Sequence, residues 1–223
     1  MRQSRRFSVW LPCQMLALAA CLVASGVRAA TCAQTDSVGL DHSYDNNYSD
    51  ISDGHASGQT FLATDTEIDA ITVWRDATWA TDGTPWHIYI MGLDSLGTPD
   101  PSLMIRDGPT LVHTDGDASH DTPFRFVFDP PVVLPAPGEY ELAVMLDQCA
   151  PGPSSLNADG GDGTDYPEGI HWDHGRQVYS CSGRPRSDPT PRPQSDLIFT
   201  IEFCRASTAV RPSTWGQIKA LYR

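Results

Sequence analysis

The chain has 223 residues and a formal net charge of −13 at pH 7, with 28 acidic against 15 basic residues. This balance argues against binding to nucleic acid or to an anionic membrane surface, because both need lysine and arginine to neutralise phosphate groups. The acidic side chains are instead expected to keep the surface soluble or to attract divalent cations.

Residues 1–29 are predicted to be a secretory signal peptide. Three arginines lie within the first six residues, an apolar run follows, and the small residues of Val27-Arg28-Ala29 place cleavage after Ala29. In a competing interpretation, Leu18-Ala19-Ala20-Cys21 is similar to a bacterial lipobox and Cys21 carries a lipid. The apolar run continues past Cys21, which favours the signal peptide. The mature protein is expected outside the cell or at the cell surface, and no later stretch is apolar enough to span a bilayer.

Three segments are predicted after the leader: a single domain at 30–204, a linker at 205–212 and a short tail at 213–223. The leader and the residues after Cys204 each hold four basic residues and no acid. The domain therefore carries a formal charge of −21, eight charges more negative than the whole chain.

Strand patterns dominate the domain. Ala30–Ser57 is polar and is predicted to be a loop with at most a short strand, and Leu93–Gly108 is predicted to be a linker that Pro99 and Pro101 interrupt. Between Gly, Pro and Asp turns, short runs of branched and aromatic residues are typical of strands. They predict nine strands, at Gly58–Ala63, Glu67–Arg75, Trp86–Gly92, Thr110–Thr114, Phe124–Phe128, Glu139–Asp147, Ile170–Trp172, Gln177–Tyr179 and Asp196–Phe203.

The stretch Pro123–Asp147 is the clearest of these patterns. Phe124, Phe126 and Phe128 alternate with other residues, and so do Tyr140, Leu142, Val144 and Leu146. The prolines and the glycine between the two runs exclude a helix and indicate a turn. A hairpin or a β-arch with one apolar face is expected, and that face needs a second apolar sheet to cover it. The predicted fold class is therefore all-β, an antiparallel, jelly-roll-like β-sandwich.

A short helix is predicted at the C-terminus. Ser213 can cap the segment TWGQIKALYR, but a helix of this length is unstable in isolation and Gly216 weakens it further. It is expected to fray, or to become ordered against a partner.

Four cysteines remain after the leader is removed, and their number is even, as expected in an oxidising compartment. A sandwich often brings its first and last strands together, which favours a Cys32–Cys204 disulfide and leaves Cys149–Cys181 to close the loop between them. Three pairings are open in principle. A zinc site is not indicated, because no CxxC motif occurs.

Several segments, in this order, resemble the secreted bacterial jelly-roll modules of the choice-of-anchor or carbohydrate-binding-like type. They are Gly58-Gln59-Thr60-Phe61, Ile71-Thr72-Val73-Trp74, Gly97-Thr98-Pro99, Pro137–Val144 and Asp196-Leu197-Ile198-Phe199. The resemblance implies a module that is commonly non-catalytic and lies on extracellular proteins. The ending STWGQIKALYR is also similar to short C-terminal endings of some secreted bacterial proteins, where it implies sorting or anchoring.

Five aromatic residues are candidates for ligand binding, because planar rings stack on the apolar faces of sugars. The alternative for each is packing in the core; Trp79 lies in a polar loop and is expected to be exposed. The candidates are Trp74, Trp79, Trp86, Tyr166 and Trp172.

The acidic stretch Asn157–Glu168 is a candidate calcium loop. Asn157, Asp159, Asp165 and Glu168 occupy positions 1, 3, 9 and 12 of a twelve-residue calcium-binding template, but position 6 is not glycine and no helices flank the stretch. It is not an EF-hand. The alternatives are a structural Ca²⁺ held by a generic acidic turn and an ordinary solvated loop.

The sequence favours a secreted, non-catalytic binding module, with a polysaccharide or cell-surface glycan as partner. One alternative is a structural or adhesion component that its C-terminal tail retains at the cell surface. The other is a hydrolase with acidic catalytic residues, which is disfavoured because no GxSxG, P-loop or HExxH motif occurs. The pair His171 and His174 with Asp173 matches no zinc spacing, and a turn is the favoured explanation.

Overall fold

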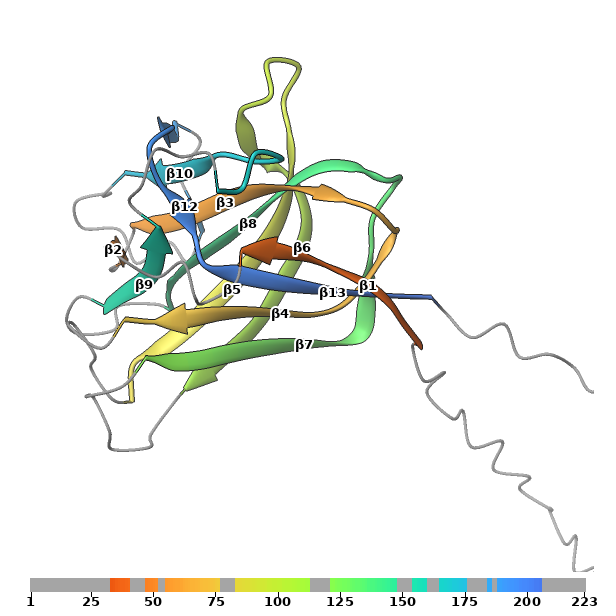
Figure 1. The fold of residues 1–223 in the computed structure, drawn as a ribbon, viewed down its shortest axis with the longest axis horizontal. Coiled ribbons are helices and arrows are strands. Elements are labelled where there is room, and N and C mark those ends of the chain that lie inside the picture. The colour runs from red at the N-terminus through yellow and green to blue at the C-terminus, as the bar shows by residue number, and fades with distance from the viewer. Residues whose placement is uncertain are drawn as a thin grey trace, which may run out of the picture.

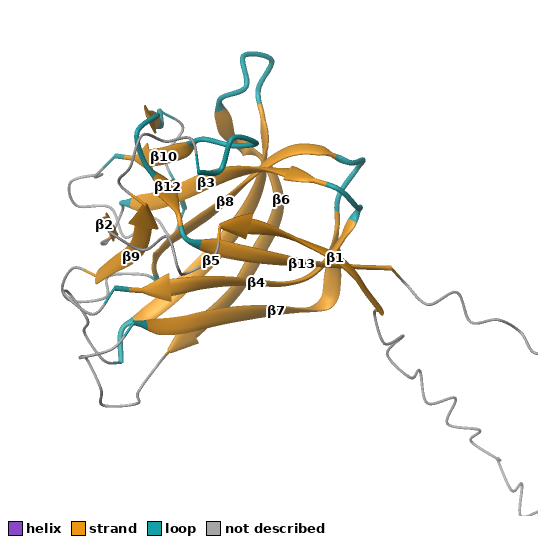
Figure 2. Ribbon diagram, in the orientation of Figure 1, coloured by secondary structure: helices purple, strands orange, loops and turns teal. Residues whose placement is uncertain are grey.

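The computed structural model describes residues 33–40, 47–51, 55–76, 83–112, 121–147, 154–159, 165–175, 184–185 and 188–205. Within these ranges the chain forms thirteen strands and no helix, which confirms the all-β prediction and corrects the expected number of strands (Figure 2). In the same ranges no helix is long or apolar enough to cross a membrane.

The first sheet has seven strands, all paired antiparallel. Its path runs β1-β13-β4-β9-β12, while β2 pairs with β9 and β7 pairs with β4 (Figure 1). The bounds are β1 (Ala33–Leu40), β2 (Asn47–Ile51), β4 (Glu67–Arg75), β7 (Thr122–Val133), β9 (Ser154–Asp159), β12 (Asp196–Leu197) and β13 (Phe199–Arg205).

The second sheet has six strands in the order β11-β10-β3-β8-β5-β6 and is also antiparallel. It lies against the first sheet as the second layer of a sandwich (Figure 1). The bounds are β3 (Ala56–Ala63), β5 (Pro85–Leu93), β6 (Pro99–Val112), β8 (Gly138–Leu146), β10 (His171–His174) and β11 (Thr190–Arg192).

The core fills the space between the two sheets, as the alternation of apolar residues predicts. On β7, Phe124, Phe126 and Phe128 are buried, while Arg125 and Val127 between them are more exposed. The other strands contribute alternate residues in the same way. Among the core side chains are Ile71, Val73, Trp86, Ile88, Ile90, Tyr140, Leu142, Val144, Leu146, Leu197, Phe199, Ile201 and Phe203.

The stretch Pro123–Asp147 forms a β-arch that connects the two sheets. β7 pairs with β4 in the seven-stranded sheet, whereas β8 lies between β3 and β5 in the six-stranded sheet. The two strands therefore face each other across the core and are not hydrogen-bonded neighbours, which decides between the two predicted geometries in favour of the arch.

Two predicted irregular segments form strands. Ala30–Ser57 contains β1 and β2, and Leu93–Gly108 contains the first part of β6, including Pro99 and Pro101. β6 is the last strand of its sheet, and an edge strand tolerates proline because the missing N–H faces away from the ladder. On β7, Pro130 and Pro131 lie within the strand where its register with β4 shifts by a bulge.

The final predicted strand is divided in two. Asp196–Leu197 forms β12, which pairs with β9, and β13 begins at Phe199 and pairs with β1 and β4. At Ile198 the N–H donates to the carbonyl of Asn157 at 3.0 Å. β1 and β13 are the first and last described strands and lie side by side, as the sequence predicts for a sandwich.

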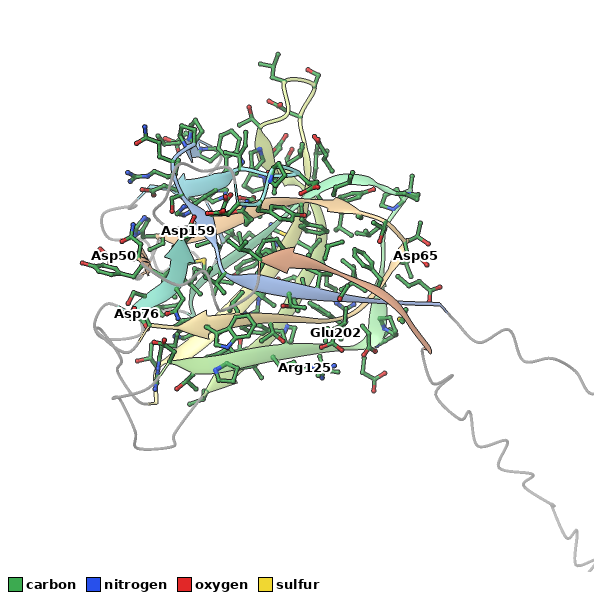
Figure 3. All side chains as sticks on the ribbon, in the orientation of Figure 1. Asp50, Asp65, Asp76, Arg125, Asp159 and Glu202 are labelled. Atoms are coloured by element: carbon green, nitrogen blue, oxygen red, sulfur yellow. The ribbon has the colours of Figure 1, made fainter. Side chains whose placement is uncertain are left out.

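The outer surface of the seven-stranded sheet carries a cross-strand ion pair. Arg125 on β7 binds Glu202 on β13 through two hydrogen bonds of 2.7 and 2.8 Å, and β4 lies between these strands (Figure 3). The guanidinium lowers the pKa of Glu202, mainly through its hydrogen bond. Because this pair is partly exposed, its contribution to stability is small.

The Tyr140 hydroxyl ties the start of β8 to the preceding turn. It donates to the carbonyl of Ala136 at 2.7 Å, while the ring is buried in the core. Replacing Tyr140 with phenylalanine keeps the ring and removes this hydrogen bond, so the free energy of unfolding is expected to fall by about 1 kcal/mol. Urea unfolding measures the change, and a stability equal to that of the wild type would show that water replaces the lost bond.

Candidate functional site

A pocket of about 250 Å³ opens between the two sheets at the end of the sandwich where β2 and β10 lie. It is distinguished by polar side chains and one tyrosine. Its lining residues are Asn47, Tyr48, Ser49, Asp50, His171, Asp173, Arg192 and Ser195.

Strand alternation places the polar groups of β10 and β3 on the same side. His171 and Asp173 are two residues apart on β10, where they pair with Gln59 and Ser57 of β3. The side chains of His171 and Ser57 meet at a distance of 2.9 Å. Trp172 and His174 lie on the opposite side of the sheet.

His171 is the centre of a hydroxyl cluster. Its Nε2 atom lies 2.9 Å from Ser57 Oγ and 3.2 Å from Ser49 Oγ, and its Nδ1 atom lies 3.1 Å from Ser195 Oγ. The Ser49 and Ser57 hydroxyls are 2.8 Å apart. A neutral imidazole has one donor and one acceptor nitrogen, so serine hydroxyls satisfy both of them.

The imidazole of His171 is neutral at pH 7. Burial, followed by the positive charge of Arg192, lowers its pKa to about 4. The side chain is only 4% exposed, so it forms part of the floor of the pocket.

Asp173 joins two basic side chains at the rim. His55 Nε2 lies 2.6 Å from its Oδ1 atom, and the Arg192 guanidinium donates a short hydrogen bond to Oδ2. The hydrogen bond from His55, and then that from Arg192, lower the pKa of Asp173, so this carboxylate stays ionised at neutral pH. Arg192 thus links β11 to β10, and His55 links the start of β3 to β10, beside the pocket.

Beneath the pocket, a buried amide joins the two sheets. Gln59 on β3 donates to Asp196 Oδ1 at 3.0 Å and accepts the N–H of Leu197 at 2.9 Å. Asp196 Oδ2 accepts the N–H of Tyr166 at 3.2 Å, and burial raises the pKa of this carboxyl. Both the nitrogen and the oxygen of the buried Gln59 amide are thus hydrogen-bonded. These bonds fix β12 against β3.

A second buried polar pair lies on the other side of the six-stranded sheet. His174 Nε2 is 2.7 Å from Glu141 Oε1, and both side chains are 0% exposed. Burial raises the pKa of Glu141, while His174 opposes the shift. Gly58 lies between them on β3: a Cβ there would come within 2.1 Å of Glu141 Oε1. The missing side chain therefore makes room for the carboxyl group.

The four predicted ligand-binding aromatics that the structure describes do not line this pocket, although Tyr166 lines a second pocket near Leu62. Trp86 is 0% exposed and stacks on Phe124 with ring centroids 4.3 Å apart, so it packs in the core, the alternative stated for each candidate. Tyr166 and Trp172 are 6% and 7% exposed, too little for a sugar to stack on either ring. Trp74 on β4 is half-buried, and Trp79 lies outside the described residues.

The predicted calcium ligands are divided between a strand and a turn. Asn157 and Asp159 are buried on β9, which corrects their placement in a loop, and Asp165 and Glu168 are exposed and line a second pocket near Leu62. Within the described ranges, no group of three or more His, Cys, Asp or Glu side chains could hold a metal ion. Calcium binding stays a prediction.

Three other predictions fall on residues outside the described ranges: the signal peptide with its Cys21 alternative, the strand at Gln177–Tyr179, and the C-terminal helix. Cys204 is disulfide-bonded and pairs in register with Gln34 on β1. Its predicted partner Cys32 and the pair Cys149–Cys181 are not described, so the disulfide pairing stays a prediction.

Sequence patterns alone did not single out Tyr48, Ser49 or Ser57. Tyr48 is 42% exposed on β2 and is the aromatic residue of the pocket. The sequence did offer one signal, an aromatic residue between Asn47 and Asp50. A tyrosine in a polar segment has few apolar neighbours to bury it, so its ring is expected to be exposed.

Comparisons with known proteins assign neither a family nor a function to the chain. No protein-family model and no curated protein matches it. Among solved structures it is similar to the cysteine protease and lectin-like domains of Cwp84, a surface layer associated protein of Clostridium difficile. The identity is 11% and the TM-score 0.47, and the likeness covers 72% of this chain and 37% of that one.

The chain is also similar to the structures of two strains of infectious bursal disease virus, each at 12% identity. For the Gt strain the TM-score is 0.26, with 84% of this chain and 47% of that chain covered. For the Gx strain it is 0.27, with 78% and 36% covered. The chain thus spans less than half the length of the structures it matches.

Proposed function

We propose that the protein is a secreted, non-catalytic binding module and that its ligand is a carbohydrate. The observation that carries this proposal is the half-exposed Tyr48 ring in a polar pocket between the two sheets. Secretion itself is inferred from the leader at residues 1–29.

The composition of the pocket suits a sugar. A sugar ring offers an apolar face to an aromatic side chain, and its hydroxyl groups need both donors and acceptors. Asn47 and Arg192 supply donors, Asp50 supplies a carboxylate, and the serine hydroxyls supply either. These groups come from β2 and from the end of β11, so the ligand would contact both sheets.

The serine–histidine cluster supports binding rather than hydrolysis. A general base works best when its pKa is near the operating pH, whereas the pKa of His171 is lowered to about 4. The hydrogen-bond partner at its Nδ1 atom is Ser195 and not a carboxylate. His171 therefore positions the hydroxyls that face the pocket.

Replacing Tyr48 with alanine is expected to weaken the binding of the preferred polysaccharide about tenfold, because the stacking surface is lost. A panel of polysaccharides and oligosaccharides, titrated by calorimetry, identifies the ligand and measures this loss. Leu103→Ala is the matched control, since Leu103 is 46% exposed on β6, outside the pocket, and its loss is expected to leave the affinity unchanged.

Absence of binding by the wild type to every glycan would overturn the proposed function. Equal affinities of the wild type and the Tyr48 variant would place the site elsewhere. Trp79→Ala, tested in parallel, would then show whether the predicted loop tryptophan is the stacking residue.

A further inference from the structure

We infer that the pocket selects its ligand by charge: it prefers glycans that carry free amino groups over neutral ones, and excludes glycans that carry carboxylates or sulfates. This inference rests on the proposed function and names the substrate class of the same site.

The charged lining of the pocket consists of two carboxylates and one guanidinium, those of Asp50, Asp173 and Arg192. The imidazole of His171 is neutral at pH 7 because burial lowers its pKa. The lining therefore carries a net negative charge.

The one positive charge of the lining is already balanced. Arg192 is hydrogen-bonded to Asp173, which also binds His55 at 2.6 Å. A carboxylate ligand would compete with Asp173 for the guanidinium. An anionic sugar would therefore have to break the ion pair between Arg192 and Asp173 to form its own, and the number of ion pairs would not increase.

Asp50, in contrast, is exposed at the end of the sandwich, and among the described residues it has no ion pair (Figure 3). It pairs in register with Ser155 of β9, whose carbonyl accepts the N–H of Asp76, the residue that follows β4. Arg75, which pairs in register with Leu156 of β9, is 1% exposed and donates to Thr122. The charge that Asp50 itself presents to the pocket is negative.

The charge of the whole protein acts in the same direction. A chain of formal charge −13 attracts cationic ligands and repels anionic ones, most strongly at low ionic strength. An ammonium group on a sugar can pair with the Asp50 carboxylate, while a neutral hydroxyl can only donate a hydrogen bond to it.

The test compares three oligosaccharides of one length and one β-1,4-linked backbone: a cello-oligosaccharide, a fully deacetylated chito-oligosaccharide, and a cello-oligosaccharide oxidised to uronic acids. Calorimetry at a pH where the amines are protonated should give an affinity for the amino sugar about fivefold above that for the neutral sugar. The uronate should bind most weakly. Raising the salt concentration from about 0.01 M to about 1 M should remove this difference, because the Debye length falls from about 30 Å to about 3 Å.

Asp50→Asn is expected to lower the ratio of amino-sugar to neutral-sugar affinity. Glu139→Gln is the matched control: Glu139 is exposed at the start of β8, and this variant removes one negative charge away from the pocket without changing the ratio. If the uronate binds as tightly as the amino sugar, or if both variants lower the ratio equally, the inference is wrong while the proposed function stands. If none of the three binds and the glycan panel is also negative, the proposed function itself fails.

Discussion

Replacing Glu141 with alanine is expected to lower the free energy of unfolding by about 3–5 kcal/mol. Its carboxyl group and the His174 imidazole are both 0% exposed and lie 2.7 Å apart. Removing the carboxyl leaves the imidazole buried without that partner, and a buried polar group that has lost its hydrogen bond bears the full cost of desolvation. Apolar side chains of the same sheet, Ala56, Met91, Ala143 and Met145, form a buried cluster with Tyr89.

The matched control is Asp107→Ala. Asp107 also accepts a hydrogen bond from a histidine, His87, at 2.6 Å, but its side chain is 59% exposed. Water can replace an exposed partner, so a loss below about 1 kcal/mol is expected. Equal losses in the two variants, measured by urea unfolding, would contradict the view that burial determines the value of these pairs.

A double variant separates the cost of breaking the pair from the value of the pair itself. Replacing Glu141 and His174 together with methionine and leucine removes both polar groups and keeps most of the volume. This variant is expected to be clearly more stable than Glu141→Ala, since a buried pair often contributes no more than apolar residues of similar size. If the double variant is the less stable of the two, the pair contributes stability of its own.

The sequence predicted the core of the fold well. On β7, β8 and β13 the alternation of large apolar residues with others identified the side chains that face the opposite sheet, because a half-buried strand must alternate. The aromatic run Phe124–Phe128 is an example: the three phenylalanines face the core, and Val127 is exposed despite being apolar. Alternation does not indicate which strands become neighbours. The sequence could therefore not decide whether β7 and β8 form a hairpin or an arch between the two sheets.

The strands that the sequence missed lie mostly at the margins of the sheets. β1 and β2 are polar, and prolines interrupt β6, so neither intrinsic propensity nor alternation marks them. Pairing decides their conformation: β1 forms a ladder with β13, and β2 forms one with β9. Such pairings between distant segments leave no local signal.

The candidate site was hidden for the same reason. Its hydroxyl cluster joins Ser49, Ser57, His171 and Ser195. These residues come from different strands and turns, and more than one hundred residues of sequence separate Ser49 and Ser57 from His171. The burial of Trp86 illustrates a different point. Tryptophan is a good sugar-binding residue and an equally good core residue, and Trp86 has neighbours such as Phe124 that bury it.

The contribution of His171 to the stability of the protein is expected to fall as the pH is lowered from 6.5 towards 4. The unfolded histidine has a pKa of 6.5, and burial in the native state lowers the pKa to about 4. Between these values the unfolded chain binds the proton more tightly than the native chain. The contribution of His171 to the free energy of unfolding is therefore fully present above pH 6.5. It is lost as the pH falls towards the pKa of the folded state, by roughly 3 kcal/mol in total.

A His171→Gln variant isolates this contribution. Glutamine keeps hydrogen-bonding capacity towards the serines but does not titrate, so the difference in unfolding free energy between wild type and variant should shrink as the pH falls from 6.5 to 4. Taking the difference between wild type and variant cancels the contributions of the other groups that titrate in this pH range. Glu141 and Asp196 have raised pKa values and therefore act in the opposite direction, stabilising the native state as the pH falls. A difference that stays constant across this range would mean that the native imidazole gains its proton as readily as an unfolded one, and that burial does not hold His171 neutral.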